Sequence, residues 1–589
     1  MKKYIDMAVR RLVYIYISIL PWIIFRKELL FNTEEKKIMP VKTAGNTDYF
    51  LYGKAAFTIV VGILLFILLF VEITVFHEKL LDFKTRRDRI LFGCMGIYIV
   101  CTVMSTILAD YKKTALSGGV NSCEGMWVLL LYPVLFLAAK FVFEMDRHKE
   151  SKNLKQQQAA AEKWSSLEWI VLIQAVILWV LSVIELLYQP VVQLATGHET
   201  QSPYVNMISL SFPSPAYCAG YIVLLAPFCM YFMVKADSLL RSVMWSVLTV
   251  TTVTACFLTR ATAGFYLVIA EGVGFAVYAV VWCKPQTWKM PAVKAVSVAA
   301  VIGVVLLTNM AAGGKIGSAV AASAVNGTTP VHKSEYYKVK EIQVQDNTVT
   351  ITGEENALIC RLNEQQNIIF TDENRNVLDV SSENNSIYFP EPYETVSAGF
   401  ENNALWLDLG YKGRIRFYIA GGKFYPMAAD GSLIRDISSG MSKENTRFDS
   451  IITGRGYIWR KTVPVLKNTV LFGHGAGTFA FYFKQFDYAG LLNSQGEVDL
   501  MIDRPHSWYL QMACSQGIFC MMAVVALIAM VCVSGIKRFT SKKPELKKGA
   551  IDMAAVTAII AFCIFEGITD GSVSVNPLLW VVLGGLTGR

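Results

Sequence analysis

Charged residues and histidines are scarce in this sequence, and several familiar site patterns are missing. Only 17% of the 589 residues are charged, and six are histidines. The twelve cysteines form no CxxC pair, and we expect only Cys123 and Cys360 to lie outside apolar segments. No small-residue cleavage site follows the basic stretch Met1 to Arg11, so we expect a membrane anchor there rather than a removed signal. These absences argue against a disulfide framework and against a cysteine metal site.

What the chain has instead is apolar sequence in long runs. It is 54% hydrophobic with a mean hydropathy of +0.41, and its charges cluster between the runs. A helix needs about 20 mostly apolar residues to cross the hydrocarbon of a bilayer. The net charge of +9 could suggest nucleic acid, but the basic residues stand in short loops beside apolar segments. We therefore expect an integral membrane protein in contact with membrane lipids, and no nucleic-acid partner.

About twelve spans are expected, with the basic loops on the cytoplasmic side. The runs cover roughly 12–25, 56–76, 90–109, 125–144, 166–188, 216–234, 242–258, 262–282, 293–311, 508–535, 549–568 and 573–588. The loops at 77–89, 145–163 and 535–548 are rich in Lys and Arg, and all follow even-numbered spans. The loop at 189–216 follows an odd span and has neither residue. The positive-inside rule then makes the N-terminus cytoplasmic.

That orientation leaves residues 312–507 outside the cell. Residues 312–452 contain 13 Lys and Arg against 18 Asp and Glu, a net charge of −5, so the rest of the chain carries +14. Between 336 and 428, short runs alternate apolar and polar residues, and turn residues separate them. This pattern predicts an extracellular all-β domain, with a sandwich expected, inserted between two parts of the membrane bundle. A passive structural insert and a glycan- or partner-binding domain are equally compatible with it.

Three motifs stand outside or at the edge of the expected spans. They are Leu258-Thr-Arg-Ala-Thr-Ala-Gly264, then Thr453-Gly-Arg-Gly-Tyr-Ile-Trp459 followed by Gly473-His-Gly-Ala-Gly-Thr-Phe479, and Arg504-Pro-His-Ser-Trp-Tyr-Leu510. In these motifs, and in its many spans with one large late outer loop, the chain resembles the O-antigen ligase and O-antigen polymerase family. The resemblance covers the membrane portion but not the β-insert. Asn121 to Met126 departs from the family pattern, because a basic residue common before Glu-Gly is absent.

The resemblance implies a glycosyltransferase C-like helical bundle organised in four parts. These are spans 1–9 in residues 1–311, the β-rich insert in 312–452, an outer loop with an amphipathic helix and a glycine turn in 453–507, and spans 10–12 in 508–589. It also implies a polyprenyl-diphosphate-linked glycan donor, a glycan, lipid or protein acceptor, and neither metal nor other cofactor. The expected location is the cytoplasmic membrane of a bacterium.

Arg260 and His506 are the candidate catalytic residues. Arg260 stands at the tip of a short hairpin on the outer side, where the positive-inside rule disfavours arginine. A snorkelling side chain is the simpler explanation, and binding of phosphate oxygens is the functional one. His506 opens the expected tenth span. A lone histidine is usually a satisfied polar residue, but an imidazole can also take a proton from an acceptor hydroxyl near neutral pH.

Arg455 and Glu566 are the candidate substrate-binding residues. Arg455 and Trp459 are four positions apart and share a helix face, whereas Arg460 points elsewhere. A helix lying on anionic headgroups would explain this run as well as a phosphate contact would. The resemblance favours Arg455 as the phosphate contact. Glu566 and Asp570, near the outer end of the eleventh span, are expected as partners of the arginines.

Together these residues predict glycan transfer on the outer face of the membrane. Arg260 and Arg455 would stabilise the leaving diphosphate, and His506 would position or deprotonate the acceptor. A ligase is favoured, a polymerase of lipid-linked repeats uses the same chemistry, and the sequence does not separate the two. A glycolipid transporter would show two related halves, which the sequence lacks. A receptor built on the β-domain would not need arginine and histidine at the rim of the bundle.

Overall fold

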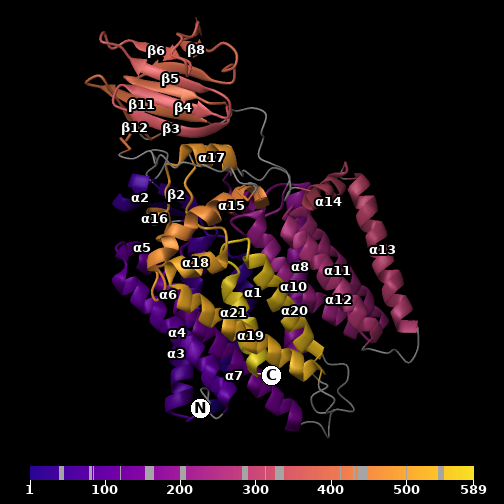
Figure 1. Ribbon diagram of the computed structural model, residues 1–589. Helices are drawn as coiled ribbons and strands as arrows, with labels where there is room; N and C mark the ends of the chain where they lie inside the picture. Colours follow the sequence, from indigo (N-terminus) through magenta and orange to yellow (C-terminus); the bar gives the residue numbers. More distant parts are fainter. Residues whose placement is uncertain are drawn as a thin grey trace.

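The protein is a helical bundle with a β-domain at one end (Figure 1). The computed structural model describes residues 1–589 apart from 39–44, 79–82, 84, 120, 153–164, 199–206, 282–288, 312, 326–336, 411–412, 429–430, 435–447, 450, 499, 541–549 and 589. Both termini lie toward the end of the bundle opposite the β-domain. We call the end that carries the β-domain the β-domain end.

The helices follow the apolar runs, with short helices in the connections. They are α1 (Lys2–Ile19), α2 (Thr33–Ile38), α3 (Leu51–Thr74), α4 (Arg86–Leu108), α5 (Lys112–Ser117), α6 (Met126–Leu129), α7 (Leu131–Lys152), α8 (Ser166–Leu187), α9 (Val191–Thr196), α10 (Pro215–Lys235), α11 (Leu239–Leu258), α12 (Thr262–Val281), α13 (Lys289–Ala311), α14 (Lys315–Val325), α15 (Ile451–Thr462), α16 (Phe479–Tyr482), α17 (Tyr488–Gln495), α18 (Trp508–Ser515), α19 (Ile518–Thr540), α20 (Ala550–Glu566) and α21 (Asn576–Gly588).

Among the residues that the structure describes, eight helices are long and apolar enough to cross a membrane. They are α3, α4, α6 with α7, α8, α10, α11, α12 and α19. The chain is therefore a multi-pass membrane protein, with fewer candidate spans than the twelve expected. The other four expected spans fall on α1, α13, α20 and α21. The apolar stretch of α13 covers only Pro291–Leu307, α20 has 17 residues and α21 has 13, and α1 begins with charged residues.

The expected span 508–535 is wrong as one continuous helix. It is divided into α18 and α19, and Gly517 between them adopts φ +110°. A Cβ atom at Gly517 would stand 2.5 Å from the carbonyl oxygen of Leu471. The glycine thus allows the chain to turn against the preceding loop, which no count of apolar residues could reveal.

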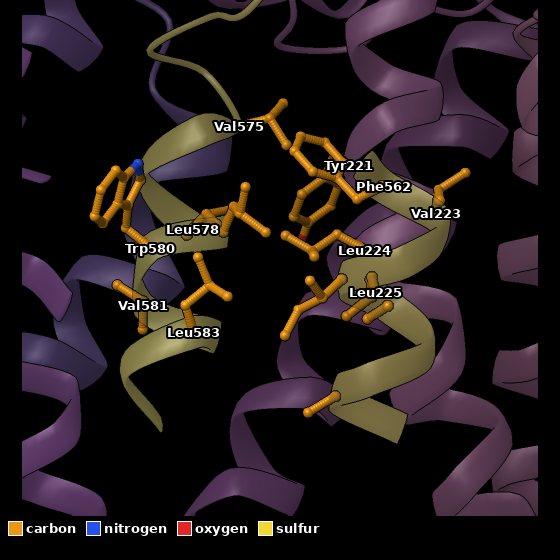
Figure 2. Packing of buried hydrophobic residues seen from close by; sticks show 14 of the residues in the cluster. Tyr221, Val223, Leu224, Leu225, Phe562, Val575, Leu578, Trp580, Val581 and Leu583 are labelled. Carbon is orange, nitrogen blue, oxygen red and sulfur yellow. The ribbon is translucent and has the colours of Figure 1, made fainter. Parts of the chain in front are cut away.

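Helix α10 forms the centre of the bundle. In its most apolar stretch 78% of the residues are buried, a larger share than in any other candidate span among the described residues. It packs against α8, α11, α12 and α20. Figure 2 shows side chains of α10, α20 and α21 meeting in one cluster, among them Leu224, Phe562 and Leu578. Helix α21 packs closely on α7, since a Cβ at Gly584 would stand 2.1 Å from the carbonyl oxygen of Phe136. Small residues allow such close helix packing in membranes.

The β-domain consists of two antiparallel sheets, and it confirms the predicted β-insert. One sheet has the order β3-β4-β5-β6 and the other β12-β11-β10-β9-β8-β7. The strands are β3 (Val339–Gln345), β4 (Thr348–Gly353), β5 (Ala357–Leu362), β6 (Ile368–Thr371), β7 (Ser381–Glu383), β8 (Ser386–Tyr388), β9 (Ser397–Glu401), β10 (Ala404–Asp408), β11 (Arg414–Ala420) and β12 (Lys423–Met427). Both sheets contribute to one apolar core.

The strands occupy a narrower range than residues 312–452. Before them, α14 packs against α11 and α12 of the bundle, and residues 326–336 and 435–447 lie outside the described residues. A separate hairpin, β1 (Lys27–Leu30) with β2 (Gly45–Asp48), precedes α3.

Candidate functional site

His506 and Asp570 form a hydrogen-bonded pair at the β-domain end of the bundle. The Nδ1 atom of His506 lies 2.6 Å from Oδ2 of Asp570. The imidazole is 37% exposed and the carboxylate only 5%. A carboxylate accepts from Nδ1–H, which leaves Nε2 of a neutral imidazole able to accept a proton. The arrangement can therefore orient a general base toward the solvent-accessible side.

Two loops far apart in the sequence hold this pair. His506 lies in the loop before α18, and Asp570 lies between α20 and α21. The backbone N–H of Trp508 donates to the carbonyl oxygen of Thr569 at 2.8 Å, and the N–H of Gly571 donates to Oε1 of Gln511 at 2.8 Å. His506 itself has φ +50°, an uncommon conformation for a residue with a side chain. Its position is thus imposed by the contacts on both sides.

Arg504, two residues before His506, is a buried cation in the same loop. Its Nη1 donates to the hydroxyl of Tyr217 at 2.7 Å, its Nη2 donates to the carbonyl oxygen of Asn121, and its Nε is 3.5 Å from Asp503. Burial works to lower the pKa of Arg504, but the oxygens of Tyr217 and the carboxylates of Asp503 and Asp570 outweigh it and raise the pKa. Arg504 is therefore charged, and it is held by α10 and by the loop before α6 as well as by the adjacent Asp503.

Arg455, on α15, lies close enough to Asp570 for the two charges to interact. Burial lowers the pKa of Arg455, while the charge of Asp570 opposes that shift. On the same helix, Nε1 of Trp459 donates to the carbonyl oxygen of His506 at 3.4 Å. Arg460 turns away and pairs with Asp449 through two hydrogen bonds of 2.8 and 2.6 Å. Arg455 and Trp459 thus share the face of α15 that is turned to His506 and Asp570.

The glycines on either side of Arg455 explain how α15 fits so closely. Gly454 has φ +84°, and a Cβ there would stand 2.4 Å from the carbonyl oxygen of Ser494. A Cβ at Gly456 would stand 1.6 Å from the carbonyl oxygen of Phe448. Only glycine fits at either position. The Gly-Arg-Gly sequence therefore lets the backbone that carries Arg455 lie against two neighbouring segments.

Asp570 is influenced by the charges of all three basic side chains. Burial alone would raise its pKa, but His506, Arg504 and Arg455 lower it. Its Oδ1 atom has no hydrogen-bond partner among the described residues. A buried carboxylate with three basic neighbours stays ionised, and its hydrogen bond fixes the position of His506. Sequence reasoning expected Asp570 beside the arginines, and the structure adds the histidine.

Two further acids surround this cluster. Glu566, four residues before Asp570, is 2% exposed, and its Oε2 has no partner among the described residues. Glu124 is 6% exposed and accepts a hydrogen bond from the hydroxyl of Tyr132. Burial raises the pKa of Glu124 to about 7, against the opposing effects of Tyr132 and Arg504. Glu566 therefore lies beside the charge cluster, with no contact to a described arginine side chain.

Arg260 lies at a different place, on the wall of a cavity of about 1100 Å³. It forms the tip of the hairpin between α11 and α12 with φ +55°, and its buried Nε has no partner among the described residues. Lys315 and Arg504 line the same cavity. His506 and Arg455 do not line it. Arg504 is thus the link between the cavity of Arg260 and the cluster around Asp570.

Buried polar groups shape the wall of this cavity. The carboxylate of Glu185 accepts from the backbone N–H groups of Ser209 at 2.8 Å and of Leu210 at 3.1 Å. The ammonium of Lys54 donates to the carbonyl oxygen of Ser211 at 2.5 Å and lies 4.4 Å from the ring centre of Phe212. These contacts fix the loop before α10 against α3 and α8, so they are structural.

The β-domain is connected to the charge cluster through α17. Tyr488 and Leu492 of α17 belong to the core of the β-domain. On its other side, Asp487 accepts from the hydroxyl of Tyr457 at 3.0 Å and pairs with Lys461 at 2.5 Å, both from α15. Gln495 donates to the carbonyl oxygen of Gly454 at 3.0 Å. A short helix thus joins the β-domain to the helix that carries Arg455.

Sequence reasoning missed Arg504 and Glu124 as members of the site. Arg504 stands in the same motif as His506, and a charged residue at the start of an apolar helix was the signal that could have identified it. Glu124 stands in a loop without other charged neighbours in sequence. Among the described residues, no group of three His, Cys, Asp or Glu side chains could hold a metal ion.

Comparison with known families matches the part of the chain that contains most of the cluster. Searches among the curated proteins and among the solved structures give no match. The matched region, residues 431–525, includes Arg455, Arg504 and His506, and it confirms the resemblance seen in the motifs. Residues 431–525 of this multi-pass membrane protein match the model of the O-antigen ligase family (Wzy_C).

Proposed function

We propose that this chain is a membrane glycan ligase that transfers a glycan from a polyprenyl diphosphate to an acceptor hydroxyl. The observation that carries the proposal is the cluster in which Asp570 holds His506 next to Arg504 and Arg455. It combines an oriented base with fixed cations, and it lies in the region that matches the O-antigen ligase family. The family implies glycan ligase or polymerase activity.

In the proposed reaction, the acceptor oxygen attacks the anomeric carbon of the donor. The acceptor O–H gives its proton to Nε2 of His506, and Asp570 stabilises the imidazolium that forms. The bond from the anomeric carbon to the diphosphate oxygen breaks with its electron pair, and the new glycosidic bond forms. The guanidinium groups of Arg455 and Arg260 hold the departing diphosphate. Fixed cations of this kind are often the largest contribution to rate.

Arg260 enters the proposal through the cavity that it shares with Arg504. An orphaned buried Nε on a strained hairpin tip is costly unless a ligand uses it. Two phosphate groups would give that guanidinium its acceptors. Glu566 has no such part, because its carboxyl group is buried and hydrogen-bonds only Thr569 among the described residues. We therefore place Arg260 and Arg455 on the donor and leave Glu566 as a buried neighbour of Asp570.

The experiment is glycan transfer by purified wild type and by His506→Gln and Arg260→Gln variants, with a lipid-diphosphate glycan as donor. Each substitution should reduce transfer about 100- to 1000-fold, because a fixed donor or base of this kind is worth that much. His474→Gln is the control for the histidine, since His474 stacks on Tyr482 away from Asp570. Arg375→Gln is the control for the arginine, since Arg375 also has positive φ but lies on the β-domain. Unchanged transfer in both test variants would refute the proposal.

We also propose that the β-domain lies outside the cytoplasmic membrane of a bacterium, where lipid-linked glycans are used. The basic segments support this side, since Arg86, Arg87 and Arg89 lie in the first turn of α4. A cysteine at Asn384, on the turn between β7 and β8, should react with an impermeant thiol reagent in intact cells. A cysteine at Arg86 should react only after permeabilisation. The reverse result would place the cluster on the wrong side for this reaction.

A further inference from the structure

A large apolar groove lies between the helices next to the cavity of Arg260. It has a volume of about 1220 Å³ and is lined by α10, α11, α12, α13 and α14. Phe257, Val268, Gly272, Phe275 and Ile302 are among the lining residues. With few exceptions, the lining is apolar. A groove of this kind inside a membrane bundle attracts hydrocarbon and not water.

Both ends of the groove are defined by polar contacts. At the end away from the β-domain, the ammonium of Lys294 donates to the carbonyl oxygen of Val234 at 2.7 Å and joins α13 to α10. At the β-domain end, the side chain of Asn309 accepts from the N–H of Gly317 at 2.8 Å. Lys294 and Asn309 are both in α13, so the groove extends roughly 22 Å along that helix. This is most of the thickness of the hydrocarbon layer.

Helix α14 separates this groove from the polar cavity. Ile316 and Gly317 line the groove, whereas Lys315 and Ser318 line the cavity that contains Arg260. Gly313 and Gly314, with φ of +63° and +80°, form the turn that brings α14 back over the bundle. The two spaces thus meet on opposite faces of one short helix. One is apolar and long, and the other is lined by Arg260, Lys315 and Arg504.

We propose that the groove binds the isoprenoid chain of the donor while its diphosphate enters the cavity at Arg260 and Lys315. This rests on the proposed function and extends it to the lipid end of the donor. An amphiphile with an anionic head and one long apolar chain fits both spaces at once. Its chain lies along α12 and α13, and its head reaches past the turn at Gly313. Lys315 then joins Arg260 as a contact of the diphosphate.

Binding in this groove serves mainly to place the donor. The chain is already in hydrocarbon before it enters, so removal from water contributes little, and close packing contributes most. A side chain that fills the groove should therefore displace the reacting end of the donor. Misplacement by about 1 Å can cost on the order of a hundredfold in rate. Transfer should then depend on chain length, because a chain too short to reach the filled part is unaffected.

Two glycines of α12 provide a matched test. Gly272 lines the groove, and a Cβ there would meet only the Cε atom of Met230, at 3.9 Å. Gly274 does not line it, and a Cβ there would meet nothing within 4 Å. We expect Gly272→Leu to lower kcat/KM for a donor with a long isoprenoid chain at least about tenfold. Gly274→Leu should leave kcat/KM unchanged, and neither variant should affect a donor with a ten-carbon chain. Equal activity of the two variants with the long-chain donor would overturn the groove assignment.

A binding measurement separates this assignment from the proposed reaction. A photoreactive isoprenyl diphosphate without sugar should label peptides of α12 and α13 in the wild type and label Gly272→Leu less. Labelling there in a protein that transfers no glycan would refute the proposed function and support the groove. Labelling elsewhere, with normal transfer, would refute the groove. If excess phospholipid competes as well as unlabelled lipid diphosphate does, the groove is an ordinary lipid site and the proposal is wrong.

Discussion

The β-domain and the β-domain end of the bundle differ in where their charged side chains lie. Among the described residues of β3 to β12, no charged or polar side chain is buried, and the ion pairs, such as that of Lys423 with Asp346, lie on the surface. At the β-domain end of the bundle, by contrast, Asp570, Glu124 and Glu566 are buried almost completely. Burying a charge is costly unless it is paired. The first region is built for stability, and the second retains costly groups that point to a function.

The strongest way to break this contrast is to neutralise Asp570. Asp570→Asn keeps the shape but removes the charge that orients His506, so transfer should fall about a thousandfold or more, as for other bases that lose their orienting carboxylate. Asp552→Asn is the control, since Asp552 is equally buried and pairs with Arg538 at 2.8 Å. It should destabilise the protein without reducing transfer per folded molecule. Equal loss of transfer in both variants would mean that only stability was affected.

The lowered pKa of Asp570 also predicts how the stability of the protein depends on pH. The pKa of Asp570 is lower in the folded protein than its ordinary value of 3.8. The unfolded chain therefore binds the proton more readily, and the contribution of Asp570 to stability is complete above that value. It is lost as the pH falls through the lowered folded pKa. Thermal unfolding in detergent should show a smaller loss of stability at acid pH for Asp570→Asn than for wild type.

The connection between the two regions gives a smaller expected effect. Asp487 joins α17, which belongs to the β-domain core, to Tyr457 and Lys461 of α15. Asp487→Asn should let α15 shift and reduce transfer about tenfold, because Arg455 on that helix would be misplaced. The β-domain itself should stay folded, which protease resistance of residues 339–427 would verify. If transfer is unchanged, the β-domain and the charge cluster are independent.

The sequence predicted the two regions unequally. Alternation of apolar and polar residues is a local pattern, so the strands of the β-domain could be found residue by residue. The motifs gave Arg455 and His506 because these stand in recognisable runs. The partnership of His506 with Asp570 joins positions 64 residues apart, and no local pattern encodes it. The division at Gly517 depends on a backbone angle, so hydropathy predicted one helix where there are two.

Arg504 shows a different limit. It stands in the motif of His506, and no local pattern assigns it a separate role in the site. Only its burial and its three hydrogen-bonding neighbours distinguish it from an interfacial arginine. Arg260 remains a prediction in its role, although the structure places it in the cavity that Arg504 also lines.

Of these predictions, the one for Glu124 has the smallest expected effect. It tests whether a buried acid of the cluster changes its charge near neutral pH, which an exposed acid of the β-domain does not. Burial raises its pKa to about 7 in the folded protein, against an ordinary value of 4.5. For an acid whose pKa is raised by folding, stability is greatest at low pH and falls as the pH rises through the folded pKa. Wild type should therefore lose stability between about pH 4.5 and pH 7, the range set by these two values.

Glu124→Gln should remove that loss while it retains an oxygen for the hydroxyl of Tyr132. Transfer at pH 6 should be nearly the same in both proteins, because Glu124 is then mostly neutral. At pH 8 the two should differ a few-fold, since only wild type has the added negative charge beside Arg504. Glu383→Gln, on the exposed strand β7, is the control and should follow wild type at every pH. If Glu124→Gln follows wild type as well, the charge of Glu124 affects neither stability nor transfer, and the prediction is wrong.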